Sequence, residues 1–264
     1  MTRFSQAINF RARWCAYTFA FLVLCLPAVA QEAVAAPLSA DEVMRRVVEM
    51  NEVRGKALES YSSLRSYHLE CHCLSHKNAD MVVRAEYQAP NRKVFTIVSE
   101  SGSGTVRDRV FKKLLAAEEE SMSEENQQRT AMTPANYAFQ LLDYQRISAG
   151  EFYVLDAQPR SKNKFLFQGH IWVNAKDFAI TRVEGEPAVN PSWWTVKTDF
   201  KRSYQKIGNF WLPESNESET KVRILGTAVL SIEYRDYQIK QTAGGTVASP
   251  PSEALAATVV VEAF

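Results

Sequence analysis

The chain has 264 residues, and its 31 Lys and Arg nearly balance its 30 Asp and Glu, which gives a formal net charge of +1 at pH 7. The first thirty residues hold three Arg and no acid, so the remainder has 28 basic and 30 acidic residues. This balance argues against a nucleic-acid-binding protein, which would carry a basic excess. The composition, 46% hydrophobic and 23% charged, excludes disorder for most of the chain. Only one apolar run approaches membrane length, which excludes a membrane protein with several spans.

The N-terminal segment has the anatomy of a secretory signal. Three arginines precede an uncharged stretch at 15–26, and the small residues Ala28-Val29-Ala30 precede Gln31. The apolar run is shorter than the ~20 residues that a membrane-spanning helix needs. We therefore expect a signal peptide over 1–30 that is cleaved near Ala30/Gln31, and a periplasmic protein.

Two helices are predicted in the first half of the chain. Ser39 and Glu42 have the spacing of a capping box, and apolar residues then recur at helical spacing as far as Tyr61. A second helix is predicted from Thr105, after a Gly- and Ser-rich break. The polar stretch 121–135 is typical of a loop.

The remaining segments alternate with period two and predict a large antiparallel sheet. Turn signals separate them at short intervals, which favours pairing between neighbours. The clearest segment, 221–234, places apolar residues on one parity and polar residues on the other. We expect one α+β domain over 31–240, followed by a flexible linker and tail at 241–264. The predicted strands are 66–74, 81–88, 94–100, 136–147, 151–157, 164–174, 178–185, 195–205, 209–217 and 221–234.

A sheet of this size predicts a concave binding surface. A single sheet of eight or more strands curls, and two short helices cover only part of its concave side, which leaves a place for an apolar ligand. Core packing is the alternative for any one aromatic residue. Trp193 and Trp194 are adjacent, so on a strand they face opposite ways and one of them is predicted at the lip of the site. The candidate ligand-binding residues are Phe165, Phe167, Trp172, Trp193, Trp194, Phe200 and Trp211.

Four segments carry a resemblance to a known family: Glu86–Val94, Gly169–Asn174, Phe178–Glu184 and Phe210–Glu214. With the order of helices and strands, they make the chain, over roughly 40–240, resemble the bacterial outer-membrane lipoprotein carrier and sorting proteins. The resemblance implies a half-open barrel with helices as a lid over an apolar cavity that binds acyl chains. We expect a lipid or an acylated protein as partner, peripheral or transient contact with a membrane, and a monomer.

Histidines and cysteines gather in one short segment, where zinc or copper could find nitrogen and sulfur ligands. On an extended strand, however, successive histidines four residues apart lie about 13 Å apart, so no two share an ion. The cysteines point to the other face. A metal site needs the segment to bend; a disulfide, or two buried thiols beside surface histidines, are the alternatives. The residues concerned are His68, Cys71, His72, Cys73 and His76.

Motifs of enzymes are missing from the sequence. It contains no nucleophile elbow, no H-E-x-x-H zinc motif and no Gly-rich phosphate loop, so we expect neither catalysis nor a cofactor. The leading hypothesis is an exported, non-enzymatic binder or carrier of lipids or acyl chains. One alternative is an envelope stress-sensing or protein-interaction module whose interior is filled by its own side chains. Another is a metal or thiol-redox protein that uses the Cys71/Cys73 segment.

Overall fold

The computed structural model describes residues 37–73, 77–190, 195–223 and 226–242, except for the side chain of Cys73. The expected signal peptide and nearly all of the expected linker and tail lie outside these residues. So do His76, Trp193 and Trp194. The cleavage site near Ala30 and the domain limits therefore stay predictions.

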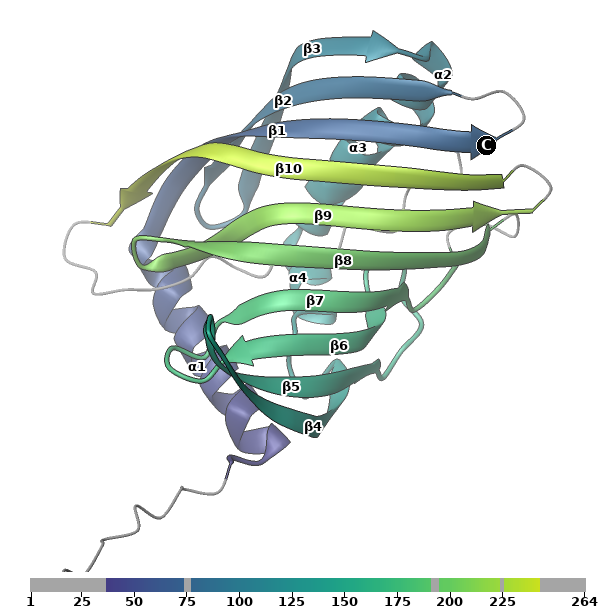
Figure 1. Ribbon diagram of the computed structural model, residues 1–264. Coiled ribbons are helices and arrows are strands. Elements are labelled where there is room, and N and C mark those ends of the chain that lie inside the picture. Colours follow the sequence, from purple (N-terminus) through teal and green to yellow (C-terminus); the bar gives the residue numbers. More distant parts are fainter. Residues whose placement is uncertain (1–36, 74–76, 191–194, 224–225, 243–264) are drawn as a thin grey trace, which may run out of the picture. The chain divides into compact units, whose positions relative to one another are not determined.

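Ten antiparallel strands form one sheet in the order β3-β2-β1-β10-β9-β8-β7-β6-β5-β4 (Figure 1). Neighbours in the sheet are neighbours in sequence, apart from β1 and β10, which pair as the third and fourth strands of the order. Strands β3 and β4 form the two edges, so the described sheet is curved and not closed. This arrangement confirms the predicted α+β half-open barrel. The strands are β1 (Leu58–Cys73), β2 (Asn78–Gln88), β3 (Arg92–Gly102), β4 (Tyr137–Ile147), β5 (Gly150–Pro159), β6 (Phe167–Asn174), β7 (Ile180–Pro187), β8 (Thr195–Ile207), β9 (Phe210–Val222) and β10 (Gly226–Gln241).

Helices cover the concave face of the sheet (Figure 1). The first begins at the predicted cap, where the Ser39 hydroxyl accepts a hydrogen bond from the Glu42 N–H at 3.3 Å. The others follow one another and connect edge strand β3 to edge strand β4, so this part of the chain crosses the concave face. The helices are α1 (Ala40–Ala57), α2 (Gly104–Val106), η1 (Arg107–Phe111), α3 (Lys112–Ser121) and α4 (Glu124–Thr130).

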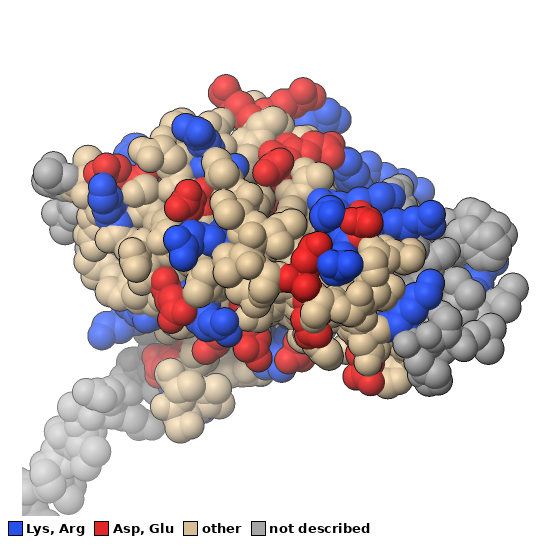
Figure 2. Space-filling view, turned by 90° about the horizontal axis from the view of Figure 1, so that it is seen from above, with Lys and Arg blue, Asp and Glu red and all other residues tan. Residues whose placement is uncertain are grey.

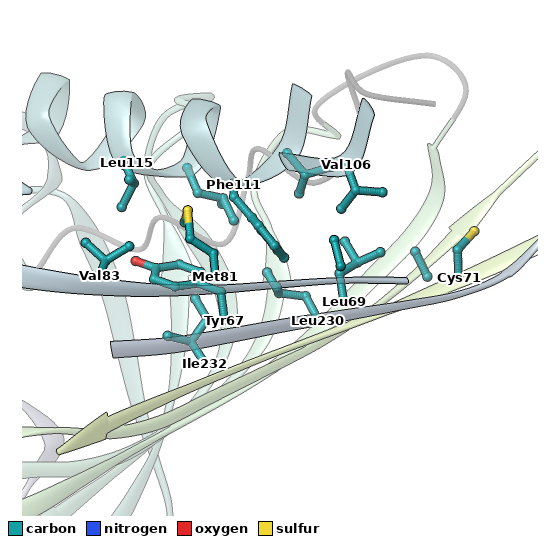
Figure 3. Packing of buried hydrophobic residues seen from close by; sticks show 14 of the residues in the cluster. Tyr67, Leu69, Cys71, Met81, Val83, Val106, Phe111, Leu115, Leu230 and Ile232 are labelled. Carbon is teal, nitrogen blue, oxygen red and sulfur yellow. The ribbon is translucent and has the colours of Figure 1, made fainter. Parts of the chain in front are cut away.

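The buried apolar residues form separate clusters. In the first cluster, α2, η1 and α3 pack on β1, β2 and β10, and the Phe111 ring lies 5.7 Å from the Tyr67 ring (Figure 3). In the second cluster, Val43, Met44 and Val47 of α1 pack on the inner face of β4 to β8. A third, smaller cluster lies around the end of α1 and the start of β9. The helices are thus held to the sheet at distinct places.

The first helix ends earlier than predicted. Helix α1 stops at Ala57, and Leu58 and Tyr61 belong to β1. Both side chains are nonetheless buried, although they are three residues apart, because the β1–β10 register shifts between Leu58 and Ser60. A β-bulge places such residues on one face of a strand and so imitates helical spacing.

Two further segments differ from the prediction. The predicted strand 221–234 is divided by a turn, because β9 ends at Val222 and β10 begins at Gly226. The predicted loop 121–135 contains α4, which is capped by the Ser123 hydroxyl accepting from the Asn126 N–H at 3.3 Å. This helix is polar, so its sequence lacks the apolar stripe by which helices are recognised.

Charged residues are mixed over the visible surface. Figure 2 shows acidic and basic side chains interspersed on the face that it draws, which agrees with the near-neutral composition. Within the residues that the structure describes, no helix has the length and apolar character that crossing a membrane requires.

Candidate functional site

The inner face of β8 and β9 carries polar side chains where the neighbouring strands carry apolar ones. In the register, Thr198 lies opposite Thr220, Phe200 opposite Ser218, and Arg202 opposite Asn216. Phe200 belongs to the second cluster, so its partner Ser218 and the other residues of this parity face the interior. Thr195 has the other parity but joins this face, because the β8–β9 register shifts between Thr195 and Lys197 and pairs Thr195 with the buried Val222. We call six buried polar residues of this face the polar strip. They are Thr195, Thr198, Arg202, Asn216, Ser218 and Thr220, each no more than 5% exposed.

The polar strip lies between the two large apolar clusters. On β10, Ile232 and Leu230 pair with Asn216 and Ser218 and belong to the first cluster. On β7, Val183 pairs with Arg202 and belongs to the second. An apolar surface, a polar strip and a second apolar surface therefore follow one another across the inner face of the sheet.

Several oxygens of the strip lack hydrogen-bond partners. The Thr198 and Thr220 hydroxyls lie 3.1 Å apart and bond to each other. The Thr195 Oγ1, Asn216 Oδ1 and Ser218 Oγ atoms are buried and form no hydrogen bond within the described part of the chain. A buried polar atom without a partner costs about 1–3 kcal/mol. Folding alone gives no reason to retain such atoms, because apolar side chains of similar size fit these positions without that cost.

A buried ion cluster joins helix α3 to the sheet. Glu118 of α3 accepts hydrogen bonds from Arg65 Nη1 of β1 at 2.7 and 3.0 Å, and its Oε1 lies 2.5 Å from Lys93 Nζ of β3. The Arg65 guanidinium also lies over the rings of Phe95 and Tyr234, at 5.2 and 4.9 Å. Burial beside this cluster raises the pKa of the Tyr67 hydroxyl to about 12. The covering helix is therefore attached by charge as well as by apolar packing.

A second polar contact attaches helix α1 to the turn between β6 and β7. The buried Arg54 side chain of α1 donates to the Asp177 carbonyl in the β6–β7 turn. The Asp177 carboxylate accepts from Lys206 Nζ at 2.7 Å and from Trp211 Nε1 at 2.9 Å. Burial raises the pKa of this carboxyl, but the hydrogen bonds from Lys206 and Trp211 and the Lys206 and Arg54 charges outweigh it, so the pKa lies below its usual value.

The structure separates the aromatic residues that the sequence proposed as one ligand site. Phe165, Phe167 and Phe200 are buried, and the rings of the last two lie 5.8 Å apart within the second cluster. Trp172 lies on the opposite face of β6 from the buried Ile171 and Val173, with the Arg182 guanidinium 4.4 Å above its ring. Trp211 is half-buried and uses its indole N–H on Asp177. Trp193 and Trp194 lie outside the described residues, so their place at a lip stays a prediction.

The His/Cys segment follows the alternation of a strand. His68 and His72 are exposed on β1, where His68 Nδ1 lies 2.7 Å from an Asp80 carboxylate oxygen. Cys71 is 1% exposed and disulfide-bonded, and its partner's side chain is not among those described. In the described part of the chain, no group of three or more potential ligands could hold a metal ion.

Sequence reasoning missed the polar strip, although β9 carries a signal for it. From Asn216 to Lys221, small neutral polar residues alternate with charged ones. The charged residues Glu217 and Glu219 are exposed, whereas Asn216 and Ser218 are buried. A strand that alternates neutral polar residues with charged residues is thus expected to turn the neutral polar residues toward the interior of the protein.

No family model matches the chain, and no curated protein matches it. Solved structures do match. A LolA superfamily protein from Nitrosomonas europaea is 12% identical at a TM-score of 0.36, over 78% of this chain and 96% of that one. A putative outer membrane lipoprotein-sorting protein domain from Vibrio parahaemolyticus is 9% identical at 0.40, over 75% and 93%. The MucA/MucB complex of Pseudomonas aeruginosa contains a chain 6% identical at 0.24, over 76% and 100%.

Two of these matched structures carry the names of the group of proteins that the sequence resembles. With identities of 6–12% and TM-scores below 0.5, these similarities carry no information on ligands. What this chain binds depends on its own residues.

Proposed function

We propose that the protein is an exported, non-enzymatic binder or carrier of lipids or acyl chains, whose partner is a lipid or an acylated protein. The observation that carries this proposal is the interior of the half-open barrel. Two apolar clusters lie on either side of a buried polar strip that retains unpartnered oxygens. This sequence of surfaces suits an amphiphile, which has both an apolar chain and a polar end.

The attachment of the helices supports the same proposal. Helices α1 and α3 contact the sheet at separate clusters and through two localised polar contacts, Glu118 with Arg65 and Arg54 with Asp177. A cover fixed at a few points opens at lower free energy than one with continuous packing. Such a cover would admit a ligand between helices and sheet. Export is supported by the signal anatomy of residues 1–30.

The test begins with the purified protein. Mass spectrometry of an organic extract is expected to show a bound lipid, and a fluorescent fatty-acid probe is expected to bind with saturation. Ser218→Leu, which fills the strip from within, should weaken the probe at least tenfold. Glu217→Leu makes the same change on the exposed face of the same strand and should leave binding unchanged. An extract without lipid, together with a probe that does not saturate, would rule the proposal out.

A further inference from the structure

We propose that Asn216 and Ser218 bind the polar end of the amphiphile, and that this end is an uncharged group with an N–H or O–H donor, an amide or a hydroxyl. This inference rests on the proposed function and adds the chemical class of the ligand's polar end. Ser218 pairs with Phe200 of the second cluster and with Leu230 of the first. The apolar chain would therefore continue from this point against either cluster.

Asn216 and Ser218 are close enough to share one ligand group. They stand two positions apart on β9, so both side chains point to the inner face from Cα atoms about 6.6 Å apart. Asn216 is 2% exposed and Ser218 is 5% exposed. Thr195 pairs with Val222, about 20 Å along the strand from Asn216, and takes no part in this site. The site is thus limited to two neighbouring side chains of one strand.

The unused hydrogen-bonding capacity of the two side chains defines the group that fits them. Asn216 Oδ1 and Ser218 Oγ are buried and form no hydrogen bond within the described residues. An amide oxygen only accepts hydrogen bonds, whereas a hydroxyl both donates and accepts. The ligand must therefore supply a donor for Asn216, and its own oxygen can accept from Ser218. An amide with an N–H and a hydroxyl group meet both demands, whereas an ester, an ether or a carboxylate lacks the donor.

The charges inside the barrel favour an uncharged donor over an ammonium group. Among the described residues, the buried carboxylate is that of Glu118, and Arg65 and Lys93 already share it. Arg202, which pairs with Asn216, is positively charged and already interacts within the chain. An ammonium group at the strip would therefore lack a carboxylate to pair with, and burying an unpaired charge costs far more than burying a neutral group.

The experiment compares two pairs of probes with the same apolar chain. The first pair is hexadecanamide and N,N-dimethylhexadecanamide, and the second is hexadecanol and hexadecyl methyl ether. Both members of each pair carry an acceptor, but only the first carries a donor. Dissociation constants are measured for the wild type, Asn216→Leu, Ser218→Ala and Ser231→Ala. The last is the matched control, because Ser231 lies on the opposite face of β10 from the buried Leu230 and Ile232.

We expect the wild type to bind the donor-bearing member of at least one pair about fivefold more tightly than the other member, the usual net effect of one hydrogen bond. Asn216→Leu should remove this preference, because leucine offers no acceptor. Ser218→Ala should weaken both members severalfold and keep the preference, since both use their acceptor on Ser218. Ser231→Ala should change neither. The pair with the larger preference identifies the polar end as an amide or a hydroxyl group.

Equal affinity within both pairs in the wild type would overturn the inference, because the strip would then not select a donor. So would a preference that persists in Asn216→Leu, which would assign it to the added methyl groups of the probes. If Asn216→Leu does not fold, N-methylhexadecanamide decides in the wild type. It keeps one N–H, so it should bind like hexadecanamide, and binding as weak as that of the dimethyl amide would refute the role of the donor. Failure of all four probes to bind the wild type would instead refute the proposed function on which this inference depends.

Discussion

At the scale of single residues, Glu118 carries the attachment of α3 to the sheet. Its carboxylate is shared by Arg65 and Lys93, and all three side chains are buried. Removing one partner of a buried ion pair costs about 3–5 kcal/mol, because charge remains in a poorly solvating interior. Glu118→Gln should therefore lower the free energy of unfolding by about that amount in urea titrations. Glu119→Gln, the exposed neighbour on the same helix, should change it by less than about 0.5 kcal/mol. Equal unfolding midpoints for the two variants would contradict this role.

Asp177 should make the free energy of unfolding depend on pH in acidic solution. Its pKa in the folded protein is below its usual value, whereas in the unfolded chain it is about 3.9. The unfolded state therefore binds the proton more readily than the folded state. The contribution of ionised Asp177 to the free energy of unfolding is complete above about pH 4 and is lost as the pH falls through the pKa of the folded protein.

In Asp177→Asn this contribution is absent at every pH. The variant should unfold at lower urea than the wild type at pH 6, and the difference should shrink at pH 3. Glu59→Gln removes an exposed carboxyl from β1 and should leave the pH dependence as it is. A constant difference between Asp177→Asn and the wild type at both pH values would contradict the assignment.

Sequence reasoning at this scale found buried aromatic residues but not the candidate site. The sequence predicts Phe167 and Phe200 at an apolar ligand site, and both lie within the second cluster. The sequence does not predict Arg202 and Asn216 at that site, because a polar residue on a strand normally lies on the solvent face. Which face they occupy depends on the register between β8 and β9, and register is a tertiary property.

At the scale of elements, a pair of glycines sets the close approach of β6 and β7. Gly169 lies opposite Gly185, and a Cβ on Gly169 would stand 2.1 Å from the Glu184 carbonyl oxygen. Gly169→Ala should cost about 3 kcal/mol of stability, because the backbone of one strand must move. Gly104→Ala is the control: its Cβ would find its nearest neighbour, Arg107 Nη2, at 3.6 Å, and stability should change by less than about 1 kcal/mol. Thermal unfolding of both variants tests the difference, and equal losses would refute it.

The elements themselves were largely predictable, and the errors have a common cause. Val222 and Gly226 are paired across the β9–β10 turn, so even-numbered residues point to the same face of the sheet before and after it. The alternation in the sequence therefore continues from β9 into β10 without a visible break. The bulge after Leu58 breaks parity within a strand and so resembled a helix. In both segments the apolar residues recur with the predicted period, but the same period fits two structures.

At the scale of the whole molecule, the covering helices should be less protected than the sheet that they cover. Strands β1 and β10 are hydrogen-bonded on both sides, whereas η1 and α3 pack on the sheet through the side chains of the first cluster. Regions with fewer buried contacts open at lower free energy. Hydrogen exchange followed by mass spectrometry should therefore show amides of 104–130 exchanging before those of β1 and β10. Bound hexadecanoate should slow exchange in the helices most. Equal rates for helices and central strands would contradict a movable cover.

The pairing of β1 with β10 also has a consequence for how the protein is made. At one end of the β1–β10 pair, the Thr242 hydroxyl donates to the Lys56 carbonyl at 3.4 Å, across 186 positions of sequence. A chain that emerges with its amino terminus first can form the β1–β3 hairpins early, but β1 keeps an unpaired edge until β10 arrives. Contacts so distant in sequence form slowly, and an open edge is prone to pair with other chains. Loss of β10 by premature termination would therefore not trim the sheet at its margin. It would divide the sheet into two pieces, each with a new unpaired edge. Newly made chains would depend on a holding chaperone until β1 and β10 pair.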